Sequence, residues 1–542
     1  MSVKLIKILL FLFLELTVLI VSAQTGPGGI GQKNGTSSLQ LWLEADKEVF
    51  IDSLLLKVAG PGEGVLLWKD RSGNNNHVRA LTDSTLPTLS INNPYFNKQN
   101  AVQFYRNGEA PHKKTYLSSI FFNPSNDITI YCVFHALSKG GGNNVTPYKA
   151  STYDQNMWYY GAGLVDAGDP SFTNDVTLSL CDTSIAAGAG DSTTATDYCV
   201  KTPVTIKRSY FALLQKEALS GKLSIGHNNA NPSVFQAGQQ PVNHASRINI
   251  GATSDVNSIY ESPFFDGYIA EVLIYNKILT TAEKIILENY LSSKYNLTLL
   301  NNDYYRFDET SAGDFDADVA GIGKAADGSA HLSSQGEGLV ELNNALELMP
   351  GEFIFTGHNG KSLNPMHNDL PSAIDFKLER KWVLSAYGNT KSVDLIADAK
   401  ELKAINRQNL ALLIDTDNDG TFSDEKLGEG ILLPSDITTQ NRAVFRGVST
   451  VNGNTYTFAQ LKATCEPDCD AFFSPDGDGV ADVYYLQDAG KTSIFDRAGK
   501  LIKTLKTPEY WDGTDDQGNL SVPGIYFLVV NDETTRTVTL IR

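Results

Sequence analysis

The chain has 542 residues, 42% of them hydrophobic and 20% charged, with a formal net charge of −18. This length exceeds what one hydrophobic core usually supports, so we expect roughly two to four domains. The acidic surplus, without any cluster of Lys and Arg, excludes nucleic acid as a partner. Five cysteines are too few for a disulfide-rich framework.

The first residues predict export. Lys4 and Lys7 precede an apolar run over residues 8–21, and small residues follow it where a signal peptidase cleaves. We therefore expect residues 1–23 to be a signal peptide. The run is short and contains Glu15, whereas a membrane span needs about 20 apolar residues. We expect no transmembrane span in the mature chain.

The next part of the chain predicts an all-β fold. Residues 24–38 are rich in Gly and lack periodicity, which is typical of a flexible leader. From Leu39 to about Ile274, short alternating apolar runs are separated by Asn, Gly, Pro and Ser, a pattern that predicts an antiparallel sandwich. The clearest expected strands are 39–43, 101–105, 128–134 and 247–251.

One helix is predicted directly after this region. Thr280 or Thr281 can cap its N-terminus, and Glu283 falls in its first turn. Ile285, Ile286 and the residues after them have helical spacing with one mainly apolar face, and the helix is expected to end near Tyr295.

Three motifs carry a family resemblance over residues 39–299. Trp42-Leu-Glu-Ala-Asp46, the run from Trp68 to Asn74 and the run from Gly267 to Tyr275 resemble the concanavalin A-like (laminin G-type) jelly rolls of secreted proteins. The resemblance implies that the first and last strands pair. Residues 267–275 also alternate, with Tyr268, Ala270 and Val272 on one face and Ile269, Glu271 and Leu273 on the other.

Each conspicuous side chain of this region has a structural and a functional interpretation. Structurally, Trp42 and Trp68 pack in the core or at its rim, while Asp70 and Asn74 build turns through bonds to the backbone. Functionally, sugar recognition needs an exposed aromatic plane beside Asp, Asn or Gly. The ligand-binding residues predicted on that basis are Asp70, Asn74, Trp158, Tyr159 and Tyr160.

A catalytic site is the less favoured interpretation. Glycosidases on this fold carry two carboxylates alternating on one strand, about 5 Å apart. The nearest set, Glu261, Asp266 and Glu271, has a spacing that does not place the three side by side. No motif of a serine hydrolase, a zinc protease or a nucleotide-binding loop occurs.

Residues 300–460 form a second β-rich region. The runs 318–323, 355–360 and 378–383 resemble an uncharacterised β-rich domain that follows such jelly rolls, and that resemblance implies no activity. Strands are expected at 353–356 and 410–414, and a further one at 381–384.

An acidic loop in this region predicts a calcium site. The ligand types of an EF-hand-like loop are reproduced by Asp415, Asp417 and Asp419 at positions 1, 3 and 5, followed by Gly at position 6 and the carbonyl of Thr421. Lys426 replaces the usual bidentate Glu at position 12, and Asp424 or Glu425 can substitute. The alternative is a tight Asx-Gly hairpin. A shorter set in the last domain consists of Asp476, Asp478 and Asp482.

The cysteines predict two local disulfides. Cys181 and Cys199 flank a loop rich in Gly, Ala and Thr, and Cys465 and Cys469 lie four residues apart. Cys132 lies in an apolar run and is expected to be a buried free thiol.

Residues 465–542 contain four blocks in a fixed order: Phe473-Ser-Pro-Asp-Gly-Asp-Gly-Val-Ala-Asp482, Ile494-Phe-Asp-Arg-Ala-Gly499, Trp511-Asp-Gly-Thr514 and Pro523-Gly-Ile-Tyr-Phe527. Together they resemble the gliding motility-associated C-terminal domain, the type B sorting domain of the type IX secretion system. The resemblance implies a partner in that secretion machinery and a location outside the cell or on its surface. We expect an immunoglobulin-like sandwich of about seven strands.

These patterns favour an exported, non-enzymatic protein that binds a polysaccharide or surface glycan. One alternative is a polysaccharide-degrading hydrolase with a non-standard site. Another is a structural component of the cell surface without a specific ligand.

Overall fold

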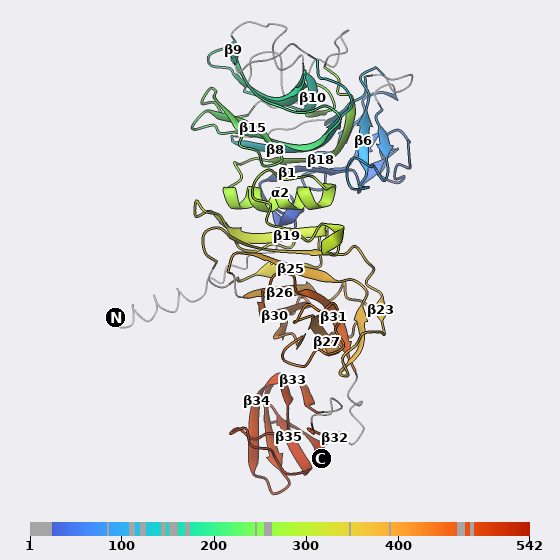
Figure 1. Cartoon of the computed structure of the whole chain (residues 1–542), viewed down its shortest axis with the longest axis vertical. Helices are drawn as coiled ribbons and strands as arrows, with labels where there is room; N and C mark the ends of the chain where they lie inside the picture. Colours follow the sequence, from blue (N-terminus) through green and yellow to red (C-terminus); the bar gives the residue numbers. More distant parts are fainter. Residues whose placement is uncertain are drawn as a thin grey trace, which may run out of the picture. The chain divides into compact units, whose positions relative to one another are not determined.

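A computed structural model of the chain describes residues 24–83, 86–107, 114–119, 126–141, 148–150, 161–167, 174–243, 247–253, 263–345, 348–389, 392–462, 472–476 and 482–541. These residues belong to two compact units. The first comprises the chain up to residue 291 together with Ser333–Glu337, and the second comprises Ser292–Leu332 and the chain from residue 338 onward. Both units consist mainly of antiparallel β-sheets (Figure 1), so the predicted all-β class is confirmed.

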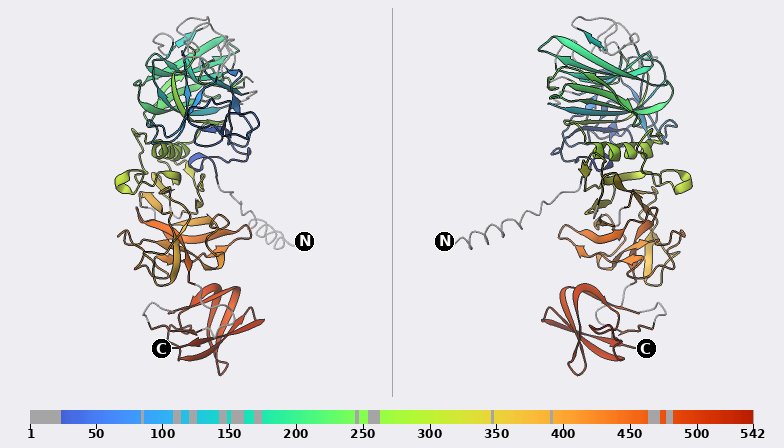
Figure 2. Two further views of the ribbon diagram at one scale, coloured as in Figure 1. Left: turned by 90° about the vertical axis from the view of Figure 1, so that its right-hand side faces the viewer. Right: turned by 60° about the vertical axis from the view of Figure 1, so that its left-hand side comes forward.

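The first unit is a sandwich of two sheets. In spatial order, the eight-stranded sheet contains β16 (Ser233–Gln236), β15 (Lys222–His227), β14 (Ser209–Lys216), β8 (Ile128–Ala136), β18 (Gly267–Tyr275), β6 (Ala101–Phe104) and β5 (Thr88–Ser90), with β1 (Leu39–Glu44) also paired to β18. The ten-stranded sheet contains β2 (Val49–Phe50), β3 (Leu67–Trp68), β4 (Val78–Arg79), β7 (Leu117–Ser119), β17 (Asn249–Ile250), β10 (Ala162–Asp166), β11 (Val176–Cys181), β12 (Ser184–Asp191), β13 (Thr196–Pro203) and β9 (Tyr148–Ala150). Figure 2 shows both curved sheets from two further directions.

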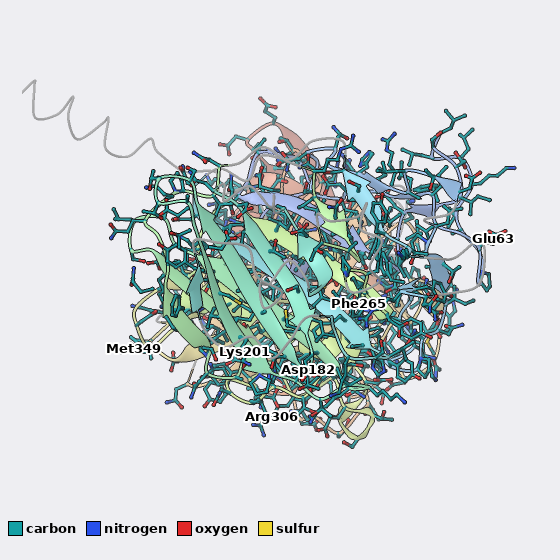
Figure 3. The ribbon with its side chains drawn as sticks, turned by 90° about the horizontal axis from the view of Figure 1, so that it is seen from above. Glu63, Asp182, Lys201, Phe265, Arg306 and Met349 are labelled. Atoms are coloured by element: carbon teal, nitrogen blue, oxygen red, sulfur yellow. The ribbon has the colours of Figure 1, made fainter. Side chains whose placement is uncertain are left out.

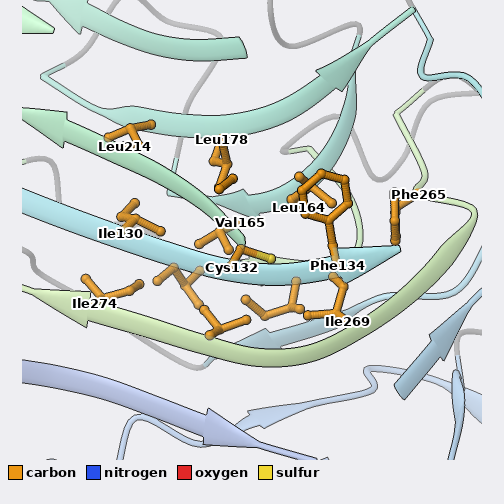
Figure 4. Close-up of a cluster of buried hydrophobic side chains, with 14 of the residues drawn as sticks. Ile130, Cys132, Phe134, Leu164, Val165, Leu178, Leu214, Phe265, Ile269 and Ile274 are labelled. Carbon is orange, nitrogen blue, oxygen red and sulfur yellow. The ribbon is translucent and has the colours of Figure 1, made fainter. Parts of the chain in front are cut away.

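The core of this unit lies between the two sheets. Alternate residues of β8, Ile130, Cys132 and Phe134, point toward Leu164 of β10 and Leu178 of β11 (Figure 4). All five are buried, because period-two alternation places every second side chain of a strand on the same face. Cys132 is a buried free thiol, as predicted.

Pairing of β1 with β18 closes the eight-stranded sheet, as the family resemblance implied. The predicted alternation along β18 is wrong at one point, because a register irregularity lies between Ile269 and Glu271. A β-bulge inserts one extra residue and shifts the phase of a strand. Ile269 and Val272 therefore both belong to the core, while Glu271 contacts side chains outside it.

Side chains on the far side of the eight-stranded sheet form a buried polar network around Trp42. Trp42 Nε1 donates to Glu271 Oε1 at 2.7 Å, and the Arg71 guanidinium lies 4.4 Å from the centre of the Trp42 ring. Arg71 also forms ion pairs with Glu44 and Glu337. Trp42 is fully buried, so its predicted packing role is confirmed.

The helix α2 (Thr281–Tyr295) confirms the predicted helix. Thr280 Oγ1 accepts a hydrogen bond from Glu283 N–H, and Glu283 Oε2 accepts one from Thr280 N–H, which makes a reciprocal capping box. The start of the helix is therefore fixed by the residues that the sequence indicated. Further along, Glu288 contacts the eight-stranded sheet, where its Oε1 accepts a 2.9 Å hydrogen bond from the Tyr131 hydroxyl. The described part of the chain also contains three short 3₁₀ helices, η1 (Pro27–Gly29), η4 (Thr310–Ala312) and η5 (Arg407–Asn409).

The second unit contains three sheets. A nine-stranded sheet consists of β20 (Ala330–His331), β19 (Ala317–Lys324), β22 (Glu352–His358), β25 (Trp382–Tyr387), β31 (Thr455–Leu461), β24 (Ile374–Leu378), β23 (Pro365–Met366), β27 (Leu410–Ile414) and β28 (Ile431–Leu432). A four-stranded sheet consists of β21 (Val340–Asn343), β26 (Ser392–Asp398), β30 (Arg442–Ser449) and β29 (Asp436–Ile437). Apolar side chains from both sheets, Trp382 and Phe445 among them, share one core.

The third sheet of this unit lies at the end of the chain and has its own core around Trp511 and Tyr526. It consists of β32 (Phe472–Phe473), β36 (Thr534–Leu540), β35 (Gly524–Val530), β33 (Tyr484–Asp496) and β34 (Leu501–Trp511). The described residues thus form five strands where about seven were expected. β33 and β34 are long strands that continue through register irregularities, so each covers the length expected of two short strands.

The buried Glu288 predicts a pH-dependent contribution to stability. Burial raises the pKa of Glu288 from 4.5 to about 7. The folded form therefore holds its proton more tightly than the unfolded form, so this residue makes the free energy of unfolding fall as pH rises from about 4.5 to 7. We expect Glu288→Gln to remove up to about 3 kcal/mol of that fall. Denaturant unfolding of wild type and Glu288→Gln at pH 5 and pH 8 measures this change in the free energy of unfolding. An equal pH dependence in the two proteins would contradict the prediction.

Candidate functional site

The outer face of the eight-stranded sheet carries a row of polar and aromatic side chains. Strand register aligns Thr88, Gln103, Tyr268, His135 and Ser209, one from each of β5, β6, β18, β8 and β14. Residues directly opposite one another in neighbouring strands point to the same face. The row is therefore continuous across five strands of the first unit.

Tyr95 lies against this row. Its ring stacks on the His135 ring with centroids 3.8 Å apart and 17° between the planes, and the Tyr268 ring lies 5.6 Å away. Asn93 Oδ1 accepts a hydrogen bond from Tyr95 N–H at 2.9 Å, which fixes the loop. Tyr95 is 42% exposed, whereas His135 is only 2% exposed. We call the rings of Tyr95, His135 and Tyr268 the Tyr95 platform.

The hydrogen bonds of His135 define its state. The Ser209 hydroxyl donates to the Tyr95 carbonyl at 2.8 Å and lies 3.0 Å from His135 Nδ1. Since that hydroxyl proton is already used, Nδ1 carries the proton and donates to Ser209. Burial lowers the pKa of His135 to about 4, so the ring is neutral at physiological pH. Its Nε2 is buried and has no hydrogen-bond partner among the described residues.

This arrangement suits recognition of a flat apolar surface with polar edges. One face of the Tyr95 ring is covered by His135, so its exposed surface points away from the sheet. Tyrosine combines a large apolar ring with a polar hydroxyl and loses little conformational freedom on binding. A ring supported from beneath is already ordered before a ligand arrives, which reduces the entropic cost of binding.

The sequence did not point to this platform. Tyr95 follows Asn93-Pro94 in a turn, and nothing in that turn indicates His135, forty positions further along. The two residues meet only because the loop before β6 folds over β8. The only signal in the sequence was a Tyr directly after an Asn-Pro turn.

Of the predicted ligand-binding residues, Asp70 and Asn74 serve a turn. Asp70 Oδ1 accepts hydrogen bonds from Trp42 N–H and Ser72 N–H, both at 2.9 Å. Asn74 Nδ2 donates to the Leu39 carbonyl at 2.9 Å. These bonds match the turn-building interpretation, and a ligand contact by either side chain stays a prediction. Trp158, Tyr159 and Tyr160 lie outside the described residues.

The ten-stranded sheet has a second polar row on its outer face. Register aligns Ser118, Asn249, Asp166 and Thr177 on β7, β17, β10 and β11. Figure 3 looks onto this face, where Lys201 of β13 is labelled. The four aligned side chains are buried, so this row is not an open surface.

In the second unit, the acidic loop after β27 gathers the predicted metal ligands. One carboxylate oxygen from each of Asp415, Asp417 and Asp419 lies within 4.8 Å of the other two. Thr421 donates its N–H to Asp419 Oδ1 at 2.7 Å, and Asp424 is exposed. The structure thus brings together the three acids at positions 1, 3 and 5.

The second acidic set lies only partly within the described residues. Asp476 Oδ2 accepts a 3.2 Å hydrogen bond from the Ser474 hydroxyl, and Asp482 is also described. Asp478 lies outside the described residues. Metal binding by this set stays a prediction.

The predicted disulfide between Cys181 and Cys199 is wrong for this structure, in which both are buried free thiols. Cys181 of β11 pairs with Ser184 of β12, whereas Cys199 of β13 pairs with Gly188 of β12. Two strand spacings alone separate the cysteines by about 10 Å, and their partners Ser184 and Gly188 are also four residues apart along β12. A disulfide needs Cα atoms within about 7 Å. The other predicted pair, Cys465 and Cys469, lies outside the described residues.

Comparison with protein families finds one match. A model described as a domain of unknown function (DUF8202) matches residues 283–454. No curated protein matches the chain. No helix among the described residues is long and apolar enough to cross a membrane.

Several solved structures resemble the chain at low sequence identity. The Ruminococcus gnavus IT-sialidase CBM40 bound to α2,3-sialyllactose is 11% identical, with 29% of this chain and 79% of that chain covered and a TM-score of 0.22. A SAP-like pentraxin from Limulus polyphemus is also 11% identical, with 34% and 78% covered and a TM-score of 0.23. The binding domain of botulinum neurotoxin serotype D/C is 10% identical, with 79% and 95% covered and a TM-score of 0.32. At these values the resemblance assigns no function to the chain.

The cysteine geometry predicts a chemical result. Burial raises the pKa of Cys181 to about 11 and raises that of Cys199 as well, so neither thiol should react in the folded protein at pH 8. Iodoacetamide should alkylate both thiols only after the protein is unfolded. No reductant should be needed, because the thiols are not joined in a disulfide. Peptide mass mapping checks this. A recovered peptide pair joined through Cys181 and Cys199 would contradict it.

Proposed function

We propose that the first unit binds glycans without altering them chemically, and that the Tyr95 platform is the contact surface. The observation that carries the proposal is the exposed Tyr95 ring stacked on the buried, neutral His135. A sugar ring has an apolar face that can lie on an aromatic plane and hydroxyls that need polar partners. Gln103 and Ser209, which are half-buried in the same row, can supply such partners.

The other features of this face favour binding over hydrolysis. Retaining and inverting glycosidases need two carboxyl groups about 5 to 9.5 Å apart at the scissile bond. Glu271, which lies on the same strand as Tyr268, accepts hydrogen bonds from Trp42 Nε1 and the Tyr290 hydroxyl and is fully buried. A carboxylate held in this way stabilises the fold and does not reach a ligand. Hydrolysis by a non-standard site and a purely structural role are the competing outcomes of the test below.

The test compares two stacked tyrosines of equal exposure. The mature chain, residues 24–542, is applied to a glycan array as wild type, Tyr95→Ala and Tyr387→Ala. Tyr387 is the matched control, because it is 43% exposed and stacks on Tyr304 at 3.9 Å in the second unit. We expect Tyr95→Ala to weaken binding about tenfold, or about 1.4 kcal/mol, and Tyr387→Ala to leave it unchanged.

Three results would contradict the proposal. If Tyr387→Ala weakens binding and Tyr95→Ala does not, the glycan binds elsewhere. Release of reducing sugar from a bound polysaccharide would establish a hydrolase instead. Absence of any bound glycan on a broad array would favour the structural role.

We further propose that the chain is exported, with residues 1–23 as signal peptide and residues 465–542 as the sorting domain that the type IX secretion machinery recognises. The support is the sequence resemblance of the four blocks, together with the separate core of the sheet that contains them. Trp511, from the third block, is fully buried in that core, and its Nε1 donates to the Thr514 carbonyl at 2.8 Å. This hydrogen bond joins the first and last residues of the block Trp511-Asp-Gly-Thr514.

Deletion of residues 465–542 tests the export proposal. We expect the truncated chain to cross the inner membrane, lose its signal peptide and accumulate in the periplasm, because only the sorting step is removed. Immunoblots of cell fractions and medium measure this. Secretion of the truncated chain at the wild-type level would refute the sorting role.

A further inference from the structure

Asp415, the residue after β27, places a buried carboxylate at the start of the acidic loop. Asp415 is 1% exposed. Its Oδ2 accepts a hydrogen bond from Gly420 N–H at 3.0 Å and lies 3.5 Å from the Thr455 hydroxyl. Its other oxygen, Oδ1, is shielded from water and accepts no hydrogen bond from a described residue. A buried carboxylate oxygen without a partner costs free energy unless a cation or a donor balances it.

Two exposed carboxylates lie beside this buried one. Oxygens of Asp417 and Asp419 fall within 4.8 Å of an oxygen of Asp415 and of each other. Of the Lys and Arg residues that the structure describes, none forms an ion pair with any of the three. Three like charges at this separation repel one another, and the repulsion needs a positive charge to offset it.

Asp369 and Glu425 also hold the loop, through contacts that do not use the oxygens of Asp415, Asp417 and Asp419. Asp369 Oδ1 accepts hydrogen bonds from Phe422 N–H at 2.8 Å and Ser423 N–H at 3.1 Å. Glu425 accepts hydrogen bonds from the N–H and the hydroxyl of Thr416. Glu425 therefore closes the loop and is not available as the bidentate ligand of an EF-hand. The ligand set is smaller than in an EF-hand, and solvent must supply the remaining ligands.

We propose that the loop of residues 415–421 binds one calcium ion, with carboxylate oxygens of Asp415, Asp417 and Asp419 and the Thr421 carbonyl as protein ligands. Calcium takes about six to eight oxygen ligands in flexible geometry, so the exposed side of the loop can complete its shell with water. Magnesium demands near-ideal octahedral geometry and retains its water, so it should bind more weakly. The ion would link the end of β27 to the loop that leads to β28, independently of glycan binding by the first unit.

Calorimetry on the full mature chain tests this site. The chain is stripped with a chelator and titrated with calcium chloride as wild type, Asp419→Asn and Asp327→Asn. Asp327 is the matched control, because its Oδ1 accepts hydrogen bonds from Ser329 N–H at 3.0 Å and the Ser329 hydroxyl at 2.6 Å. Asp419 Oδ1 makes the same two bonds to Thr421, at 2.7 and 2.8 Å. The two substitutions thus disturb the same kind of turn, and only one of them removes a proposed ligand.

We expect wild type and Asp327→Asn to bind calcium with a dissociation constant of about 10⁻⁴ to 10⁻³ M, the range of extracellular calcium modules. Asp419→Asn should bind at least about tenfold more weakly. Asp417→Asn should weaken calcium binding to the same extent. Because Asp417 is exposed, this second variant shows whether the loss in Asp419→Asn comes from the missing ligand or from misfolding. Equal binding by wild type, Asp417→Asn and Asp419→Asn would overturn the proposal. So would an absence of binding to the wild type at millimolar calcium.

Discussion

Closure of the first unit depends on one pairing between strands far apart in the chain. β1 and β18 are separated by more than two hundred residues, yet they lie side by side and place Trp42 against Glu271. Loop closure over such a distance carries an entropic cost that only many simultaneous contacts can offset. Those contacts are the core between the two sheets and the buried network of Arg71 with its carboxylates. The Tyr95 platform includes Tyr268 of β18, the strand that this closure pairs with β1.

The bulge in β18 connects this closure to the platform. It shifts the phase of the strand by one residue, so that Tyr268 lies in the outer row of the sheet while Glu271, three positions later, also contacts side chains outside the core. Without the bulge, strict alternation would place one of the two residues in the core. A single irregularity therefore allows the same strand to contribute to a stabilising network at one end and to an exposed aromatic surface at the other.

Local patterns made much of the fold predictable. The capping box at Thr280 and the alternation in residues 128–134 are determined by neighbours in sequence, so the helix and β8 lie where expected. Features set by long-range register could not be read in the same way. The distance between Cys181 and Cys199 depends on how β12 separates their strands, and the stacking of Tyr95 on His135 depends on a loop that folds across a sheet. The Asp415 loop lies between these cases: its ligand spacing is local, but the buried oxygen of Asp415 and the engagement of Glu425 appear only in three dimensions.

The segment Ser333–Glu337 has a practical consequence for dissecting the protein. The chain leaves the first unit after residue 291 and returns for five residues, during which Glu337 pairs with Lys33 and Arg71. A fragment ending at residue 299 would remove this carboxylate and leave part of a mostly buried guanidinium without its partner, a change that is costly inside a protein. The two units are interleaved in sequence, so no single cut in the chain separates them.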